Sequence, residues 1–315
     1  MQNLTRFLAS LFFVAATASV QATPFSQLVV FGDSNSDTGN VAAITSGFRP
    51  PAATYWNGRY SNGPVAVEYM ASALGISIDN YAQGGATTGT SNGSFPNGVP
   101  AWWTPAIDPS KLYGVQTQVT NYLGNHVIDP NALFFLWAGS NDFANAVPAQ
   151  FAAISLIAAN NIANELTLLH NAGGQNFFVA GLAYDKHIAG SRNEIYNTAL
   201  LAAINALAFD VTYFDTADVY TQMINDGMNN SAPCLQSTEG FVFPGQIKQA
   251  TLLPSGYTMC SNPAQYIRWD PNGHLTTAAQ SIVGAHFASA LSVPEPATLL
   301  LMGSGLAMMW LRRSK

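Results

Sequence analysis

This chain is organised around LVVFGDSNSDTGN, residues 28–40. The first four residues are apolar or β-branched and stop at Gly-Asp-Ser, which is typical of a buried strand that ends in a turn. Ser34 then lies just past the carboxyl end of the strand, where open α/β sheets place their ligands. A small hydroxyl held by a rigid sheet suits a nucleophile. The tripeptide alone leaves a plain turn as the alternative, because short motifs often match by chance.

Short apolar runs alternate with helical segments along the rest of the chain. Strands are expected over residues 76–78, 132–138, 175–180 and 211–214, and helices over residues 64–74, 148–171, 192–209, 217–228 and 276–291. The run at 132–138 is apolar throughout, as expected for a central parallel strand covered on both faces. Residues 41–60 and 87–109 are expected to be loops. The alternation predicts a parallel sheet with helices on both sides, a three-layer α/β/α sandwich.

Four sequence blocks, in order, match those of a known family. They are FGDSNSDTGN at 31–40, NYAQGGAT at 80–87, GSND at 139–142 and WDPNGH at 269–274. Each block is weak alone, but together, over residues 28–291, the chain strongly resembles the GDSL lipase/esterase family, also called SGNH hydrolases. Asn35 stands where the family name has leucine. The resemblance implies a flavodoxin-like sheet and serine ester hydrolysis without a metal or an organic cofactor.

A serine hydroxyl needs a base, and the chain offers five histidines. His274 is favoured because Asp270 stands four residues before it, and a nearby carboxylate can hold the imidazole tautomer. The family block is Asp-x-x-His-Pro, whereas this block is one residue longer and lacks the proline. A turn at Gly273 can absorb the extra residue. His187, in a loop beside an aspartate and a lysine, is the rival base, and nearby main-chain carbonyls are the alternative to Asp270.

The donors for a developing oxyanion follow from the resemblance. They are the main-chain N–H groups of Ser34 and Gly85 and the side-chain amide of Asn141, with Gly84 as the alternative glycine. Loss of one such donor typically costs about 3–4 kcal/mol. Without the family, Asn141 is a turn residue after a strand. The tryptophans at 102–103, in the long loop, either line an acyl or sugar pocket or pack as filler.

The two ends of the chain are expected to be addresses rather than parts of the fold. Residues 1–22 carry Arg6, the apolar run 7–18 and a terminal Val-Gln-Ala, the layout of a signal peptide that signal peptidase cuts after Ala22. A buried N-terminal helix is the alternative. The hydrolase domain is then expected to span residues 23–292.

Residues 293–315 contain Pro294-Glu295-Pro296, a short apolar run and a basic tail. This end resembles the PEP-CTERM sorting signal, which implies processing by an exosortase in a Gram-negative bacterium. Fifteen residues at ~1.5 Å each reach only ~22 Å, short of the ~30 Å hydrocarbon core, so a transient anchor is expected. A plain membrane helix is the alternative. The expected location is the periplasm, the cell surface or the extracellular matrix.

Charged residues make up 9% of the chain, far below the ~25% of ordinary soluble proteins, and the net charge is −6. Since Arg6 and the basic tail lie in the end segments, the body between them is more acidic still. No basic block interleaved with aromatic residues occurs, so nucleic acid is not an expected partner. An acidic exported protein is also not expected to favour anionic polymers.

The chain has two cysteines, Cys234 and Cys260. Export places them in an oxidising space, so one disulfide is expected, worth about 3 kcal/mol on the chain-entropy estimate. A metal pair is the weaker alternative because no histidine stands between or beside them.

Three functions remain open from the sequence. The favoured one is a secreted serine esterase or lipase acting on an ester substrate. A carbohydrate O-deacetylase would use the same residues, and a surface or matrix binding protein could keep the fold without the chemistry.

Overall fold

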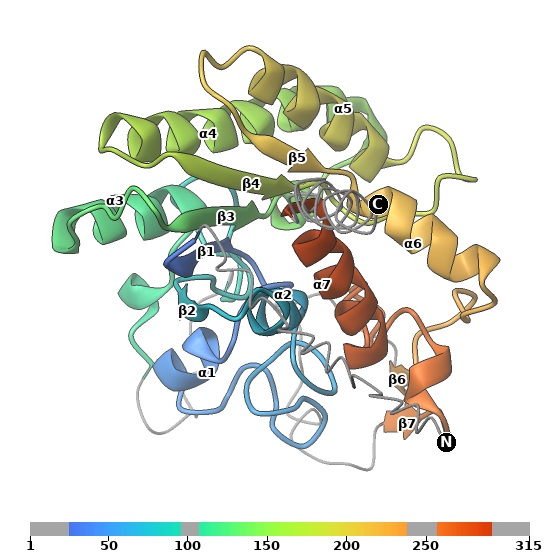
Figure 1. Ribbon diagram of the computed structural model, residues 1–315. Helices are drawn as coiled ribbons and strands as arrows, with labels where there is room; N and C mark the ends of the chain where they lie inside the picture. Colours follow the sequence, from blue (N-terminus) through green and yellow to red (C-terminus); the bar gives the residue numbers. More distant parts are fainter. Residues whose placement is uncertain (1–24, 96–106, 238–256, 292–315) are drawn as a thin grey trace, which may run out of the picture.

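The computed structural model describes residues 25–95, 107–237 and 257–291. A parallel five-stranded sheet lies between two layers of helices (Figure 1). The strand order is β2-β1-β3-β4-β5, and every neighbouring pair is parallel. The strands are β1 (Gln27–Gly32), β2 (Ser77–Asn80), β3 (Leu133–Trp137), β4 (Asn176–Ala180) and β5 (Thr212–Phe214). The predicted α/β/α sandwich is confirmed, with the strand order of flavodoxin-like sheets.

Three helices pack on each face of the sheet, and each face has its own apolar core. One face is covered by α2 (Ala66–Leu74), α6 (Thr216–Asn225) and α7 (Thr277–Leu291), and the other by α3 (Val115–Asn125), α4 (Phe151–Asn171) and α5 (Arg192–Asn205). The shorter helices are α1 (Asn40–Ile44), η1 (Pro109–Lys111), η2 (Ser140–Phe143), η3 (Pro148–Gln150) and η6 (Pro263–Gln265).

The side chains of the central strands are apolar on both faces of the sheet, because helices cover both faces. Every residue of β3 is buried. Phe135 stacks on Phe178 of β4 at 5.5 Å between ring centroids, and Phe287 of α7 packs against Phe135 at 5.4 Å. Full burial of one such ring contributes roughly 1.5–3 kcal/mol. The sheet is therefore a rigid support for whatever follows its strands.

Among the described residues, two α-helices lie where no helix was predicted. The short α1 falls in a stretch expected to be loop, and α3 has a sequence with few strongly apolar residues. Val115, Val119 and Tyr122 form its narrow buried stripe at helical spacing. Gln118 is also buried, and its side-chain amide bonds both the N–H and the C=O of Gly32, each at 3.0 Å. This polar anchor explains why hydrophobic periodicity alone missed the helix.

The two cysteines form the predicted disulfide, Cys234–Cys260. It lies beside a small antiparallel sheet of β6 (Leu235–Ser237) and β7 (Tyr257–Met259), which was not predicted. Cys234, Leu235, Tyr55 and Trp269 form a third apolar cluster. We call β6, β7 and this disulfide the disulfide hairpin.

The expected signal peptide at 1–22, the sorting signal at 293–315 and the tryptophans at 102–103 lie outside the described residues. Within the described part, one helix, Pro148–Asn171, is long and apolar enough to cross a membrane by length and composition alone. It combines η3 and α4, and α4 packs its buried side chains against the sheet.

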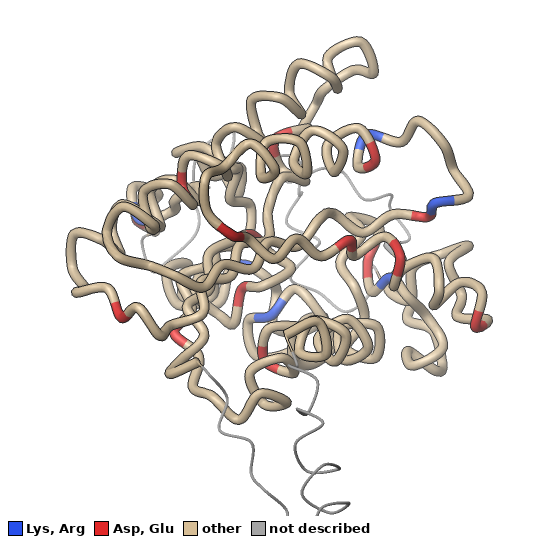
Figure 2. Tube along the Cα trace, turned by 45° about the horizontal axis from the view of Figure 1, so that its top comes forward, with Lys and Arg blue, Asp and Glu red and all other residues tan. Residues whose placement is uncertain are grey.

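Figure 2 shows Lys and Arg at scattered positions along the described chain.

Candidate active site

Ser34 follows the carboxyl end of β1 and is 6% exposed. The chain can turn there because residue 32 is glycine: a Cβ at Gly32 would overlap the carbonyl oxygen of Trp137. The next N–H, of Asp33, donates to that same carbonyl at 3.2 Å. The buried Asp33 carboxylate accepts hydrogen bonds from the Asn35 N–H and, at 3.0 Å, from the Ser140 hydroxyl. Ser34 is thus held between the ends of two neighbouring strands.

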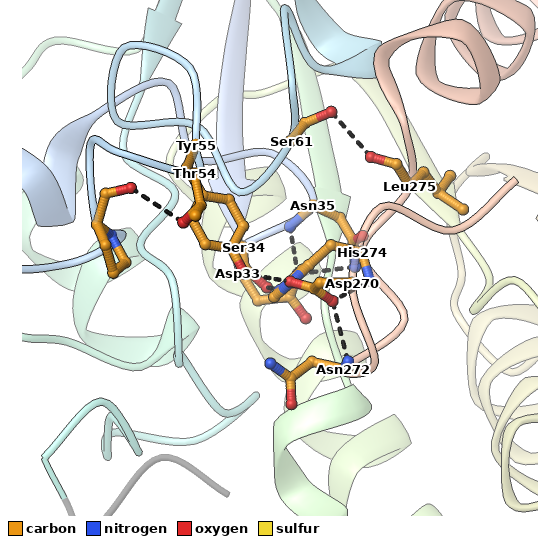
Figure 3. Close-up of polar contacts among 11 residues, drawn as sticks. Asp33, Ser34, Asn35, Thr54, Tyr55, Ser61, Asp270, Asn272, His274 and Leu275 are labelled. Atoms are coloured by element: carbon orange, nitrogen blue, oxygen red, sulfur yellow. Dashed lines mark hydrogen bonds and ion pairs between the residues drawn. The ribbon is translucent and has the colours of Figure 1, made fainter. Parts of the chain in front are cut away.

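The imidazole of His274 meets Ser34 across 240 positions of sequence (Figure 3). The Nε2 atom lies 2.7 Å from the Ser34 Oγ, and Nδ1 lies 2.5 Å from Oδ2 of Asp270. With Nδ1–H donating to the carboxylate, Nε2 is free to accept the Ser34 hydroxyl proton. The three side chains form one hydrogen-bonded chain, as a serine nucleophile with an oriented base requires.

The longer turn between Asp270 and His274 still lets the two groups meet. Gly273 adopts a φ of +91° and has open space around its Cα, so it absorbs the extra residue. Oδ1 of Asp270 accepts the N–H of Asn272 at 2.9 Å and that of His274 at 3.3 Å. The acid is fully buried and braced by its own turn. Main-chain carbonyls are not needed in its place.

The pKa of His274 reflects two opposing effects. Burial lowers it, but the charge of Asp270 and the hydrogen bond to it raise it, with a smaller contribution from Asp33. The net result is a pKa above the usual value of histidine. The imidazolium that forms when the ring takes a proton is therefore stabilised.

The loops that carry the expected oxyanion donors are joined to one another by hydrogen bonds. Asn141 in η2 donates from Nδ2 to the carbonyl of Ala86 at 2.9 Å and to Oδ2 of Asp33 at 3.5 Å, which ties its block to the glycine pair and to the loop after β1. Gly84 donates its N–H to Asp37 at 2.8 Å, so it is already engaged. Within the described part of the chain, the N–H groups of Ser34 and Gly85 make no such internal bond. This favours Gly85 over Gly84 as the free donor.

Residue 85 must be glycine for two reasons. Its φ is +81°, a conformation that other residues rarely adopt. A Cβ there would also lie 2.5 Å from the Ser94 Oγ and 2.7 Å from Oδ1 of Asn92. The loop after β2 can pack against residues 92–94 in this way only because this side chain is absent.

Buried carboxylates join the blocks to one another. Asp37 accepts the N–H groups of Gly39, Asn40 and Gly84, and burial raises its pKa to about 6 against these bonds. Asp142 accepts the N–H and hydroxyl of Thr88 at 3.0 and 2.7 Å. These side chains hold the three loops that follow β1, β2 and β3 in fixed relation.

A segment before α2, which we call the clamp segment (residues 51–64), also reaches the site and was not predicted to do so. The Tyr55 hydroxyl donates to Oδ2 of Asp270 at 2.5 Å, and the Ser61 hydroxyl donates to the carbonyl of Leu275 at 2.8 Å (Figure 3). The ring of Tyr60 lies 5.1 Å from the imidazole of His274. The partners are more than 200 positions apart, so no local sequence pattern could reveal them.

The rival base lies elsewhere. His187 is exposed, and its Nδ1 pairs with Asp185 at 2.8 Å in the loop before α5. Among residues 25–95, 107–237 and 257–291, no group of three or more His, Cys, Asp or Glu side chains is arranged to hold a metal ion.

Comparison with known proteins identifies the family of this chain. The family profile of the GDSL-like lipase/acylhydrolases matches residues 28–287, and that of the PEP-CTERM protein-sorting motif matches residues 292–313. The chain is 26% identical over 293 residues to a phosphatidylcholine-sterol acyltransferase of Aeromonas hydrophila, covering 87% of this chain and 82% of that protein. It is also 26% identical over 341 residues to acetylajmalan esterase 2 of Rauvolfia serpentina, covering 86% and 91%.

Among solved structures, a lipolytic protein of the G-D-S-L family from Veillonella parvula is similar, with a TM-score of 0.40 and 14% identity. The match covers 64% of this chain and 84% of that one. The sorting motif indicates export and delivery to the envelope or surface of a Gram-negative bacterium. With a profile match over most of its length, the chain belongs to the GDSL-like lipase/acylhydrolase family, whose relatives above are named for acyl transfer and ester hydrolysis.

Proposed function

We propose that this protein is an exported serine ester hydrolase. Ser34 is the nucleophile, His274 the general base and acid, and Asp270 the group that orients the imidazole. The observation that carries the proposal is the continuous hydrogen-bonded chain from the Ser34 Oγ through both nitrogens of His274 to Asp270. A free serine hydroxyl is inert at neutral pH, and a base at 2.7 Å supplies the activation that it needs.

In the first half-reaction, Nε2 of His274 takes the Ser34 proton as Oγ attacks the ester carbonyl carbon. The carbonyl oxygen becomes an oxyanion, which accepts hydrogen bonds from the N–H groups of Ser34 and Gly85 and the amide of Asn141. Asp270 balances the positive charge on the imidazolium. The carbon–oxygen bond of the ester then breaks, and His274 returns the proton to the leaving alcohol.

In the second half-reaction, His274 takes a proton from water, which attacks the acyl group on Ser34. The second tetrahedral intermediate collapses with the proton delivered to Oγ, and the free acid leaves. An alcohol in place of water would give acyl transfer by the same steps. The relative named as an acyltransferase supports that variant as a second outcome of one mechanism.

The proposed address follows from the ends of the chain. Signal peptidase would remove residues 1–22, and an exosortase would process the sorting motif at residues 292–313. The hydrolase domain at 23–292 would then act in the periplasm, at the surface or in the extracellular matrix.

Two other functions fit less well or use the same site. A binding protein without catalysis has no need of an aligned serine, imidazole and carboxylate, so their contacts weigh against it. A carbohydrate O-deacetylase would use the same three residues. Values of kcat/KM for acetylated polysaccharide and for medium-chain acyl esters distinguish the deacetylase from the lipid esterase.

The test uses purified protein, a soluble aryl ester and a fluorophosphonate probe, which reacts only with an activated serine. We expect Ser34→Ala to lose the label and at least about 10³-fold in kcat, with an unchanged melting temperature. Ser36→Ala is the matched control, because its buried hydroxyl has no hydrogen-bond partner in the described structure. Labelling of Ser34→Ala, or no labelling of the wild type, contradicts the proposal.

A further inference from the structure

The carboxylate of Asp270 carries more hydrogen bonds than a histidine partner requires. Its Oδ2 accepts from Nδ1 of His274 and also from the hydroxyl of Tyr55, each at 2.5 Å (Figure 3). Its Oδ1 accepts two main-chain N–H groups, those of Asn272 and His274. Within the part of the chain that the structure describes, each oxygen has two donors, and the phenol is the one donor that comes from outside the turn.

Tyr55 is fixed in place by the surrounding structure. Its ring is 9% exposed and packs with Cys234, Leu235 and Trp269, so the disulfide hairpin forms part of its seat. Its N–H donates to the carbonyl of Pro51 at 3.1 Å. Burial, followed by the charge of Asp270, raises the pKa of Tyr55 well above its usual value, so the phenol remains a donor at any working pH.

The clamp segment holds the acid–histidine turn at both ends. Tyr55 bonds the acid at its start, and Asn62 accepts the N–H of Thr277 at 2.8 Å just beyond it. The turn needs such support because it is one residue longer than the family block and contains Gly273 with a φ of +91°. A longer turn with a glycine has more conformations available, and each external contact removes some of them.

We propose that Tyr55 is a positioning residue, which fixes Asp270 and through it the imidazole of His274. This inference rests on the proposed hydrolase function. The phenol acts at the oxygen that faces the imidazole, so it sets both the direction and the strength of the His274–Asp270 contact.

The charge effect has a definite sign. Two carboxylates act on the charge of the His274 ring, those of Asp270 and Asp33, and the ring also contacts the Ser34 hydroxyl and lies beside the ring of Tyr60. A hydrogen bond from Tyr55 withdraws negative charge from Oδ2 of Asp270. Removing the phenol concentrates that charge on the imidazolium, so the pKa of His274 should rise further above its usual value.

The first experiment is the pH profile of kcat/KM for a soluble aryl ester with Tyr55→Phe. We expect the acidic limb to move to higher pH and kcat to fall about tenfold, or about 1.4 kcal/mol, with little change in KM. Tyr220→Phe is the matched control: that hydroxyl donates to Asn230 at 2.6 Å, and its ring is 7% exposed. The control should leave the acidic limb in place.

A second readout does not depend on turnover. The pKa of His274, followed by NMR of the imidazole, should rise in Tyr55→Phe. It should fall when 3-fluorotyrosine is incorporated at position 55, because a more acidic phenol is a stronger donor to Asp270. The fluorinated protein keeps the ring and its packing, so it tests the proposal even if Tyr55→Phe does not fold.

An unchanged pKa of His274 in both altered proteins, with unchanged kcat in a folded Tyr55→Phe, overturns the proposal. If the wild type hydrolyses no ester but the pKa of His274 shifts as expected, the hydrolase function fails and the coupling of Tyr55 to His274 stands.

Discussion

The two halves of the site are supported in different ways. Ser34 and Asn141 follow β1 and β3, adjacent strands whose side chains are buried on both faces of the sheet. Asp270 and His274 lie on a turn between η6 and α7, which belongs to no strand of the main sheet. That turn is held by the clamp segment and lies against the disulfide hairpin.

Because the two halves are supported differently, substitutions in them should have different effects on the free energy of unfolding and on kcat. Changes behind Ser34 disturb the core, so they should alter the free energy of unfolding. Changes around Asp270 disturb a turn that lies outside the main sheet, so they should alter kcat with a smaller effect on the fold. Rate and melting temperature, measured together for each variant, show to which half a residue belongs.

The largest effect is expected from His274→Ala. Without the base, the Ser34 hydroxyl has no acceptor for its proton, and kcat should fall by at least about 10⁴-fold. The melting temperature should change little, since His274 is on the turn. His187→Ala is the control: as the exposed rival base it should retain wild-type kcat. A loss of rate in His187→Ala instead would transfer the role of base to that residue.

The next largest effect concerns Asn141, which follows strand β3 on the Ser34 side of the site. Asn141→Ala removes one of the proposed oxyanion donors, and kcat should fall about 10²–10³-fold. Asn176→Ala also removes an amide, which bonds the carbonyl of Pro130 at 3.0 Å at the start of β4. That control should lower the melting temperature and leave kcat unchanged. Equal rates in the two variants would exclude Asn141 from the oxyanion site.

Removing the disulfide should have an intermediate effect, on both the free energy of unfolding and kcat. Cys234→Ser combined with Cys260→Ser frees a loop of 26 positions, which should reduce the free energy of unfolding by about 3 kcal/mol. Because the hairpin seats Tyr55, kcat should also fall in the protein that remains folded. Denaturant titration and ester turnover measure the two losses. Wild-type kcat in the folded variant would show that the hairpin supports the fold alone.

The smallest effect concerns Glu165 in α4, which is 1% exposed and whose carboxylate has no hydrogen-bond partner in the described structure. Burial, followed by the charge of Asp142, raises its pKa well above the usual value. The unfolded chain releases this proton at a lower pH, so the free energy of unfolding falls as pH rises above about 4.5. Glu165→Met should therefore stabilise the protein by about 1–3 kcal/mol at neutral pH.

Thermal melting of Glu165→Met between pH 4 and pH 8 checks this sign. The gain should shrink towards pH 4, where the carboxyl is neutral in both states. A gain that is the same at every pH would show that packing, and not the buried carboxyl, is responsible. The rate of ester hydrolysis should not change, because in the described structure the Glu165 carboxyl makes no hydrogen bond to a residue of the site.

The sequence was most informative where function depends on strand ends. The apolar runs before Ser34 and Gly139 predicted strands of a parallel sheet, and the fold and the family are confirmed; the structure adds that the two strands are neighbours. The structure brings Ser34, His274 and Asp270 together as expected, while their roles in the reaction remain the proposal. The end segments at 1–22 and 293–315 lie outside the described residues, and the profile match at 292–313 supports the sorting signal.

The sequence was least informative about contacts made across long separations. Tyr55 reaches Asp270 over 215 positions, and nothing near Tyr55 in sequence marks it as different from any other loop aromatic. Gln118 has the same property, since a buried amide in α3 interrupts the apolar stripe that would have predicted the helix. Tyr55 acts through its hydroxyl and Gln118 through its side-chain amide. Hydrophobic periodicity marks the positions of apolar side chains, so it does not reveal polar contacts of this kind.

Because the disulfide hairpin packs against Tyr55, the support of the Asp270–His274 turn depends on whether the chain is in a reducing or an oxidising compartment. Its cross-link forms only under oxidising conditions, and the same hairpin seats the phenol that holds the acid. A newly made chain in the reducing cytoplasm lacks that cross-link, so its acid–histidine turn is held less firmly. On the proposed export route, the cross-link would form only after passage through the membrane, and the proposed esterase would meet esters inside the cell only with its acid–histidine turn less firmly held.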